Sequence, residues 1–247
     1  MVPIKPYKKE LEYSYTLGAF PTIELLKTRP EQVLGVYLHS SAADTAGLRT
    51  LCAELGIPVL EGDRAMAKAS PKENVYVMGV FSKFSDTLRG DRPHLVLVDP
   101  SDMGNLGTIL RTAAGFGYND IALIEPCADR FAPRAVRASM GALFRVRTHA
   151  WHSFEEYREA FPQHALYPFM LTGAAVLTPG NPIPPPLYAL VFGNEATGLP
   201  DSFAGLGTSV FIPQTEAVDS LNLTIAAGIG MYLFNQNRNS TESEKLL

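Results

Sequence analysis

The sequence contains little cysteine and no hydrophobic stretch long enough to cross a membrane. Its two cysteines, Cys52 and Cys127, lie far apart and lack the close spacing of paired metal ligands, so we expect neither a disulfide framework nor a metal site. The longest apolar runs fall short of the roughly 20 residues that a transmembrane helix needs, and no apolar signal segment follows the N-terminal lysines. These absences predict a cytoplasmic protein without a membrane anchor.

Several common nucleotide-binding and hydrolase motifs are absent as well. No G-x-G-x-x-G follows an apolar run, no G-x-x-x-x-G-K-[ST] occurs, and no G-x-S-x-G is present. His149 and His152 are three residues apart but have no further ligands nearby in the sequence, and we interpret them as surface residues. The sequence therefore disfavours a dinucleotide-binding fold, a P-loop NTPase and an α/β-hydrolase.

An excess of positive charge is also missing, because 21 lysines and arginines stand against 25 aspartates and glutamates, for a net charge of −4. This balance argues against a protein that binds nucleic acid through its overall charge. One local basic cluster follows Asp129, and it comprises Arg130, Arg134, Arg137, Arg145 and Arg147. Charge alone is compatible with a solvated surface or with a phosphate-binding one, and the latter requires the side chains to converge.

What is present is the composition of a folded protein, with 46% hydrophobic and 19% charged residues. Residues 16–84 have the pattern of a small α/β unit, with helical spacing at 19–28 and 45–56 and strand-like stretches between and after them. The polar run 85–94 interrupts this pattern. We therefore predict a first domain over residues 1–92.

From residue 93 onward, short continuous apolar runs alternate with helical segments. The runs cover 95–99, 121–125, 143–148, 165–172, 187–192 and 209–213. This pattern predicts an α/β domain over residues 93–236, whose mostly parallel sheet carries helices on both faces. Ligands of such sheets bind beyond the carboxyl ends of the strands, which are predicted at Asp99, Thr172, Phe192 and Pro213. The proline-rich segment 178–186 cannot be helical, and residues 237–247 are expected to form a flexible tail.

The segment 101–117, SDMGNLGTILRTAAGFG, has the apolar spacing of a core-facing helix, and Arg111 falls off the apolar stripe. We interpret Asn105 as a helix cap and Gly107, one turn before Arg111, as clearance for a ligand beside the guanidinium. Solvation on a helix surface accounts equally well for Arg111. This segment alone does not decide between the two interpretations.

Two further segments are rich in polar and small residues at predicted strand ends. The stretch 191–200, VFGNEATGLP, places Gly193 and Glu195 after a buried strand, where glycine permits a close approach of backbone to a ligand. An ordinary turn between a strand and a helix has the same composition. In the stretch 211–234, Ser220 is interpreted as the N-cap of a long helix. Asn222 in its first turn is a candidate to bind a polar ligand, since asparagine is a mediocre helix former.

Taken together and in order, N-x-G-x-x-x-R at 105–111, VFGNEATGL and IP…SLN resemble the three signature motifs of the SpoU (TrmH-like) branch of the SPOUT RNA methyltransferases. The resemblance covers about residues 93–236 and includes ASMGALFRV at 138–146. It implies S-adenosylmethionine-dependent methyl transfer to a ribose 2′-hydroxyl of structured RNA by a homodimer with a trefoil-knot fold. Residues 1–92 are more loosely similar to the small RNA-recognition domain that many members carry.

The resemblance also implies roles for individual residues. It makes Arg111 the catalytic arginine, with Asn105, Glu195, Ser220 and Asn222 as polar groups of the active site. It implies a cofactor pocket lined by Thr172, Gly173, Gly193, Asn194, Ile212, Leu221 and Leu223. With RNA as the substrate, we predict RNA contacts by Arg130, Arg134, Arg137 and Arg145.

The sequence departs from the usual third motif at two positions, where Gln214 and Glu216 stand in place of the common methionine and glycine. Two other functions remain open at this point. One is an RNA- or protein-binding member of the fold without catalysis, and the other is methylation of a base. By analogy, the front domain favours ribosomal RNA over transfer RNA.

Overall fold

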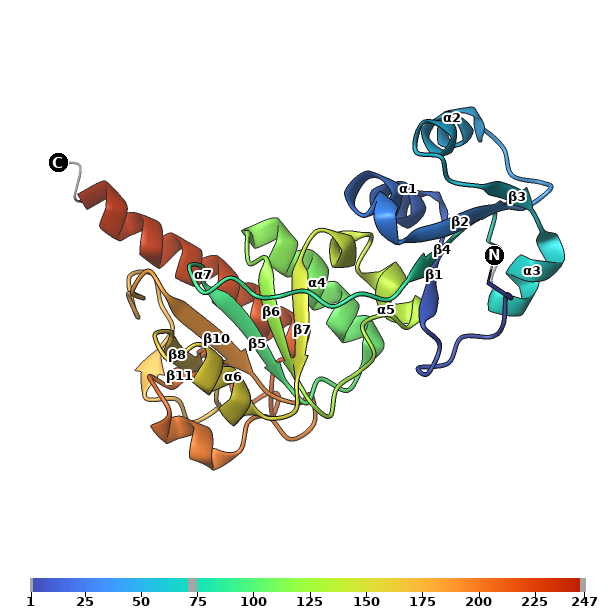
Figure 1. The fold of residues 1–247 in the computed structure, drawn as a ribbon. Helices are drawn as coiled ribbons and strands as arrows, with labels where there is room; N and C mark the ends of the chain where they lie inside the picture. Colours follow the sequence, from blue (N-terminus) through green and yellow to red (C-terminus); the bar gives the residue numbers. More distant parts are fainter. Residues whose placement is uncertain (1, 71–74, 245–247) are drawn as a thin grey trace.

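A computed structural model describes residues 2–70 and 75–244, which form two α/β units joined by residues 83–93 (Figure 1). The small unit contains β1 (Tyr13–Leu17), α1 (Ala19–Thr28), η1 (Pro30–Gln32), β2 (Val33–Leu38), α2 (Ala46–Glu54), β3 (Val59–Glu61), α3 (Asp63–Ala69) and β4 (Val77–Ser82). Its sheet has the order β1-β4-β2-β3, in which β4 is antiparallel to β1 and β2, and β3 is parallel to β2. The domain boundary that we place at 92/93 falls in the connecting segment.

Strand β1 is missing from the sequence prediction because its buried residues are not all apolar. Tyr13 and Tyr15 are buried on one face, but Ser14 and Thr16 are also buried. The Ser14 hydroxyl donates a hydrogen bond to the Phe131 carbonyl of the large unit, and the Thr16 and Thr22 hydroxyls are 2.7 Å apart. These partners satisfy the polar groups, so a strand without a hydrophobic run can be fully covered.

The large unit contains β5 (His94–Val98), α4 (Met103–Phe116), β6 (Asp120–Ile124), α5 (Pro133–Ala138), η2 (Ala142–Phe144), β7 (Arg147–Trp151), α6 (Phe154–Ala160), β8 (Ala165–Pro168), β9 (Ala175–Val176), β10 (Tyr188–Phe192), η3 (Asp201–Gly205), β11 (Val210–Phe211) and α7 (Leu223–Glu244). Its main sheet has the order β7-β6-β5-β10-β8, and every neighbouring pair is parallel. The predicted α/β fold with a parallel sheet is confirmed.

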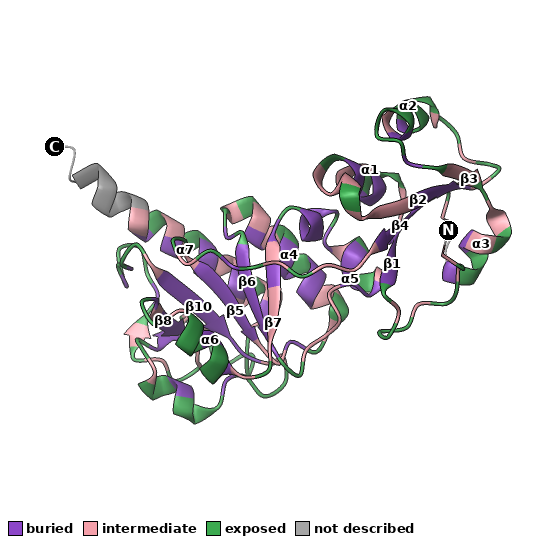
Figure 2. Cartoon of the chain, in the orientation of Figure 1, coloured by how far each residue is buried: buried purple, intermediate pink, exposed green. Residues whose placement is uncertain are grey.

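The main sheet is covered on both faces, which explains the unbroken apolar runs (Figures 1 and 2). On β5, Leu95 and Leu97 pack into the core beneath α4 and α7, whereas Val96 points to the opposite core beneath α6 and η3. Alternation along a strand places successive side chains on opposite faces. Both faces need apolar residues here, so the strands show no polar alternation.

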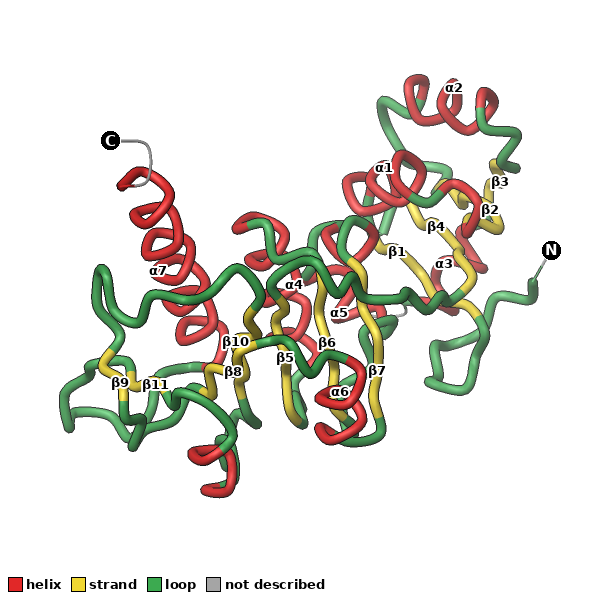
Figure 3. The backbone as a smooth tube through the Cα atoms, turned by 60° about the vertical axis from the view of Figure 1, so that its left-hand side comes forward, coloured by secondary structure: helices red, strands yellow, loops and turns green. Residues whose placement is uncertain are grey.

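Two of the predicted strands are wrong in part. Residues 142–144 form the 3-10 turn η2, because Phe144 packs edge-on against Phe81 of the small unit, with ring centroids 5.1 Å apart. The run 209–213 does not join the main sheet. Its strand β11 pairs instead with β9 in a separate two-stranded sheet (Figure 3).

The expected flexible tail is also wrong for its first residues, because α7 continues to Glu244 (Figure 3). Asn237 is buried and its amide nitrogen donates to the carbonyls of Thr178 (3.1 Å) and Pro182 (3.0 Å). Its amide oxygen accepts from the Gly180 N–H. The proline-rich segment, which is not helical, is thereby tied to the last helix; residues 245–247 lie outside the described residues.

Polar contacts hold the small unit against the large one. The Arg29 guanidinium donates to the carbonyls of Phe144 (3.0 Å) and Val146 (3.3 Å) and forms an ion pair with Asp86 (2.9 Å). Arg145 binds the Glu24 carboxylate at 2.6 Å. Because these partners come from both units and from the segment between them, they fix how the units are docked.

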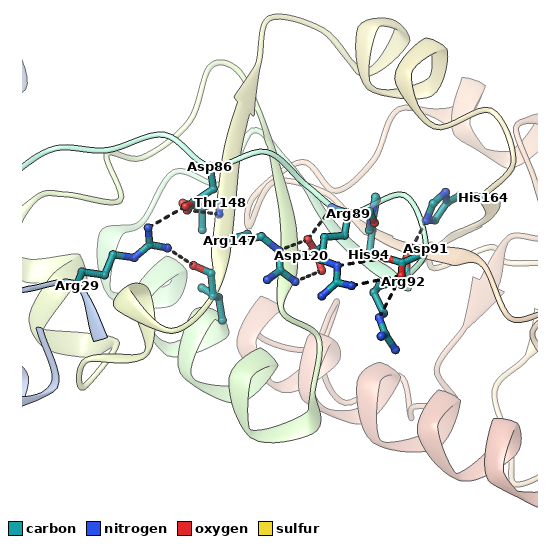
Figure 4. A network of polar contacts seen from close by, with 11 residues as sticks. Arg29, Asp86, Arg89, Asp91, Arg92, His94, Asp120, Arg147, Thr148 and His164 are labelled. Carbon is teal, nitrogen blue, oxygen red and sulfur yellow. Dashed lines mark hydrogen bonds and ion pairs between the residues drawn. The ribbon is translucent and has the colours of Figure 1, made fainter. Parts of the chain in front are cut away.

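A second polar network lies along the connecting segment, at the amino ends of the central strands (Figure 4). The Asp120 carboxylate accepts two hydrogen bonds of 2.6 Å from Arg147 and one of 2.9 Å from the Arg89 N–H. Nearby, the His94 ring nitrogens contact the Tyr157 hydroxyl and the Arg89 carbonyl, each at 2.9 Å. His94 stacks on His164 with ring centroids 4.1 Å apart.

His94 makes the stability of the fold sensitive to acid. Burial lowers its pKa to about 4, below the unfolded value of 6.5, so the folded protein keeps the ring neutral. Its stabilisation is present above pH 6.5 and is lost as the pH falls towards 4, which amounts to about 3 kcal/mol. Urea unfolding at a series of pH values should show this loss. His94→Gln should flatten the profile between these limits, whereas His152→Gln, which alters an exposed histidine, should leave it unchanged.

Candidate active site

A cavity of about 470 Å³ lies beyond the carboxyl ends of β8 and β10. The segment after β11 and the start of α7 form its other walls. Its floor is apolar and includes Phe169, Phe192 and Val210. Six of the seven residues predicted for the cofactor pocket line it: Thr172, Gly193, Asn194, Ile212, Leu221 and Leu223. The seventh, Gly173, lies next to Thr172.

Two of these glycines allow backbone segments to pass close to each other. A Cβ atom at Gly193 would lie 2.3 Å from the carbonyl carbon of Gly198 and 2.4 Å from the nitrogen of Leu199. A Cβ at Gly173 would lie 2.4 Å from the carbonyl carbon of Val210. Any side chain at either position would push the cavity walls apart.

Glu195 joins the wall of the cavity to the start of α4. Its Oε2 accepts hydrogen bonds from the Ser101 N–H (2.9 Å) and hydroxyl (2.8 Å). Its Oε1 accepts from the Asp102 N–H and from the Asn105 amide nitrogen, both at 3.1 Å. Burial acts to raise the pKa of Glu195, but these hydrogen bonds outweigh it and lower the pKa to about 2. Glu195 is therefore a fixed anion at neutral pH.

The structure corrects both helix caps. Asp102, not Asn105, caps α4, because its carboxylate accepts from the Asn105 N–H at 2.8 Å, which leaves the Asn105 side chain to bind Glu195. Asn222, not Ser220, caps α7, because its amide oxygen accepts from the N–H of Thr224 at 2.8 Å. Ser220 lines the cavity instead. The cap assignments were wrong because several neighbouring residue types can cap a helix.

Gly107 does not provide clearance for a ligand beside Arg111. A Cβ at this position would lie 2.4 Å from the carbonyl oxygen of Ala135 and 2.7 Å from the Cβ of Ala138. Gly107 is therefore required where α4 crosses α5. Arg111 is exposed on α4 and does not line the cavity.

The arginine cluster does not converge on one surface. Arg130 is stacked on Phe131 and donates to the Phe84 carbonyl, and burial lowers its pKa. Arg145 is bound to Glu24 and Arg147 to Asp120. The two arginines of α5 are exposed: Arg134 is 70% exposed and pairs with Asp102 at 3.1 Å, and Arg137 is exposed as well.

Arg137 also lines a second hollow of about 720 Å³, which lies between α5 and the small unit. Its other walls come from the turn after β1, the loop after β2 and the start of β4, where Tyr76 is exposed. The sequence prediction did not find this hollow, because its lining is spread over four segments. Ser101 was missed for the same reason, since no local pattern marks a hydrogen bond to a residue 94 positions away.

The described part of the chain contains no cluster of three or more histidine, cysteine, aspartate or glutamate side chains suited to a metal ion. No helix within residues 2–70 and 75–244 is long and apolar enough to span a membrane.

Comparison with known proteins decides the family, because residues 92–232 match the model of the SpoU rRNA methylase family. The chain belongs to this family. An uncharacterized tRNA/rRNA methyltransferase of Synechocystis sp. is 35% identical over 58% of this chain and 54% of its own length. The 23S rRNA (adenosine(1067)-2′-O)-methyltransferase of Streptomyces laurentii is 34% identical over 61% of this chain and 56% of its own length.

The fold of both units is shared with a solved structure. The AdoMet-bound rRNA methyltransferase from Sinorhizobium meliloti superposes with a TM-score of 0.76 at 24% identity, over 90% of this chain and 87% of that one. At this identity the likeness concerns the fold. The chain spans only 28% to 56% of the length of the first curated relatives that it matches.

Proposed function

We propose that this SpoU protein transfers a methyl group from S-adenosylmethionine to a ribose 2′-hydroxyl of structured RNA, with ribosomal RNA as the favoured substrate. The observation that carries the proposal is the cavity itself. The second and third segments that resemble the SpoU motifs line it, and Glu195 links the second segment to the first through Asn105. The 2′-O specificity of the Streptomyces laurentii relative supports the choice of acceptor.

The cavity suits S-adenosylmethionine in size and lining. Its volume lies within the range of small-molecule sites, and bare backbone at Gly193 allows a ligand to lie against the main chain. We propose that the seven predicted pocket residues hold the cofactor. Gly173 acts indirectly, because its lack of a side chain lets the Val210 backbone pack close to it in the cavity wall. When bound, this cofactor supplies a methyl group on a positively charged sulfur for in-line displacement by a hydroxyl oxygen.

The polar residues are suited to orientation and charge stabilisation rather than proton removal. A carboxylate with a pKa of about 2 is a poor general base at neutral pH, so Glu195 serves to hold Asn105 and the turn before α4. The guanidinium of Arg111 is permanently charged and suits a negatively charged RNA group. Ser220 lines the cavity and can bind a hydroxyl or the cofactor. The cap at Asn222 positions the chain that carries Ser220 and Leu221.

The proposal includes a homodimer and a knotted chain, as in the family. Arg111 lies outside the cavity of its own chain, so bound RNA or a second copy must bring the reacting groups to it. Apolar side chains on α4 and α7 are exposed, including Met103, Ile225 and Tyr232. Burial of these side chains against a second copy would remove apolar surface from water.

We propose that RNA binds along α5. Arg134 and Arg137 lie one turn apart on this helix, between the Glu195 cluster and the hollow beside the small unit. Arg130 and Arg145 are left out of this revised RNA surface because they hold the chain together. Tyr76 offers an exposed ring on which a base can stack.

Arg137→Ala is expected to weaken RNA binding and to lower its salt dependence, because one phosphate contact is lost. The slope of log K against log salt concentration should fall in magnitude by about one unit. Filter binding over a series of salt concentrations measures this slope. Arg158→Ala removes an exposed arginine from α6 on the opposite face of the sheet, and it should change nothing. Equal slopes for the wild type and Arg137→Ala would contradict the proposed surface.

The function is tested with tritiated S-adenosylmethionine and ribosomal RNA purified from cells that lack the protein. The wild type should label the RNA, and nucleoside mass spectrometry should find the methyl group on ribose. Arg111→Ala should lower kcat by about 100- to 1,000-fold, whereas cofactor binding in calorimetry should survive. Methyl groups on a base would overturn the 2′-O assignment, and absence of transfer with intact cofactor binding would indicate a binding protein.

A further inference from the structure

Ser101 lies in the turn between β5 and α4, before the N-x-G-x-x-x-R motif at 105–111. Its N–H and its hydroxyl provide both hydrogen bonds to Glu195 Oε2, at 2.9 and 2.8 Å. The other oxygen, Oε1, accepts from Asp102 and Asn105. Each carboxylate oxygen thus has two donors, and Ser101 alone accounts for both donors on one oxygen.

The backbone of this turn is built to present Ser101 to Glu195. Asp99 adopts the left-handed conformation, with φ of 52°, a region in which aspartate is tolerated better than most residues. Its carbonyl accepts a 2.8 Å hydrogen bond from the amide nitrogen of Asn194, the residue before Glu195. At the far end of the turn, Asp102 caps α4 and pairs with Arg134. The turn is therefore anchored on both sides of Ser101.

The orientation of Asn105 depends on this arrangement. An ionised carboxylate only accepts hydrogen bonds, so Asn105 must present its amide nitrogen to Glu195. The amide oxygen is then the group left to accept a hydrogen bond from a hydroxyl. A carboxylate held by several charge-assisted hydrogen bonds keeps one orientation. The Asn105 amide, which donates to this carboxylate, is thereby held in one orientation as well.

We infer that Ser101 is a positioning residue of the methyl-transfer site, which fixes Glu195 and through it the Asn105 amide. This inference rests on the proposed function. Loss of the hydroxyl leaves the carboxylate with fewer donors and more freedom, so transfer slows although substrates still bind. Threonine retains the hydroxyl and should replace serine.

The test compares single-turnover methyl transfer to ribosomal RNA by Ser101→Ala, Ser101→Thr, Glu195→Gln and the double variant Ser101→Ala/Glu195→Gln. Ser101→Ala should transfer about tenfold more slowly, the expected effect of one lost hydrogen bond to a charged group. Its dissociation constants for S-adenosylmethionine and RNA should stay within about twofold of the wild type, and Ser101→Thr should restore the rate. In the Glu195→Gln background, Ser101→Ala should have no further effect, because the two residues act as one unit.

Ser153→Ala is the matched control, because it removes a serine that caps α6 on the other face of the sheet. It should leave the transfer rate unchanged. Two results would overturn the role of Ser101 while the proposed function stands. One is a wild-type transfer rate in Ser101→Ala, and the other is a double variant that transfers tenfold more slowly than Glu195→Gln alone. A wild type that transfers no methyl group would overturn the proposed function and this inference with it.

Discussion

Gly193→Ala is expected to bind S-adenosylmethionine about 10- to 100-fold more weakly than the wild type, which corresponds to the usual cost of overpacking. The added Cβ would meet the backbone of Gly198 and Leu199 at 2.3 to 2.4 Å. Backbone atoms cannot turn aside as a flexible side chain can, so the loop 194–198 must move. This movement changes the cavity wall and displaces Glu195 from its donors.

Isothermal titration calorimetry measures this loss, and circular dichroism establishes that the variant is folded. Gly115→Ala is the matched control, because a Cβ at this exposed position of α4 would meet nothing within 4 Å. It should bind the cofactor like the wild type. Unchanged affinity in Gly193→Ala would show that the cofactor does not use this wall of the cavity.

Asp120→Ala is expected to lower the free energy of unfolding by about 3 to 5 kcal/mol, the range found when one partner of a buried ion pair is removed. Asp120 is 1% exposed, and its loss leaves the Arg147 guanidinium and the Arg89 N–H without their acceptor. Arg147 then keeps a charge in a mostly covered site. A protein of this size should lose roughly 6 to 20 °C in Tm.

Urea unfolding measures the free energy, and Asp91→Ala provides the control. Asp91 pairs with Arg89 and Arg92 in the same segment (Figure 4), but its side chain is 63% exposed. Its removal should cost less than about 1 kcal/mol, as for other surface pairs. A similarly small loss for Asp120→Ala would show that the Asp120 pair does not stabilise the domain.

Most of the fold could be predicted because the large unit follows local rules. The apolar runs in β5, β6 and β10 mark strands that are covered on both sides, and the spacing in α4 marks a helix packed on one side. Prediction failed where burial did not require apolar residues, as in β1, and where apolar residues serve another contact, as at Phe144. Both failures depend on partners from the other unit.

The lining of the cavity was predictable from the sequence, but the hydrogen-bond partners around it were not. The motif resemblance found the lining of the cavity, whereas it assigned no partner to Glu195. The caps at Asp102 and Asn222 are local features that the sequence contains but does not rank, because serine, aspartate and asparagine cap helices about equally well. The sequence predicts that Gly107 leaves space for a ligand beside Arg111. In the structure this space is filled by α5, which begins 26 residues later along the chain.

The sequence by itself determined the parallel sheet, the helices over it and the family, since hydrophobic periodicity and motif order are properties of neighbouring residues. The tertiary structure alone decided which charges are available for function. Arg130 and Arg134 are four positions apart, yet Arg130 is half-buried against an aromatic ring and a backbone carbonyl, whereas Arg134 is 70% exposed. Asn105 and Glu195 are 90 positions apart, yet their side chains bind each other. Hydrogen bonds and ion pairs act over a few ångströms in space, and only the folded chain determines which groups come that close.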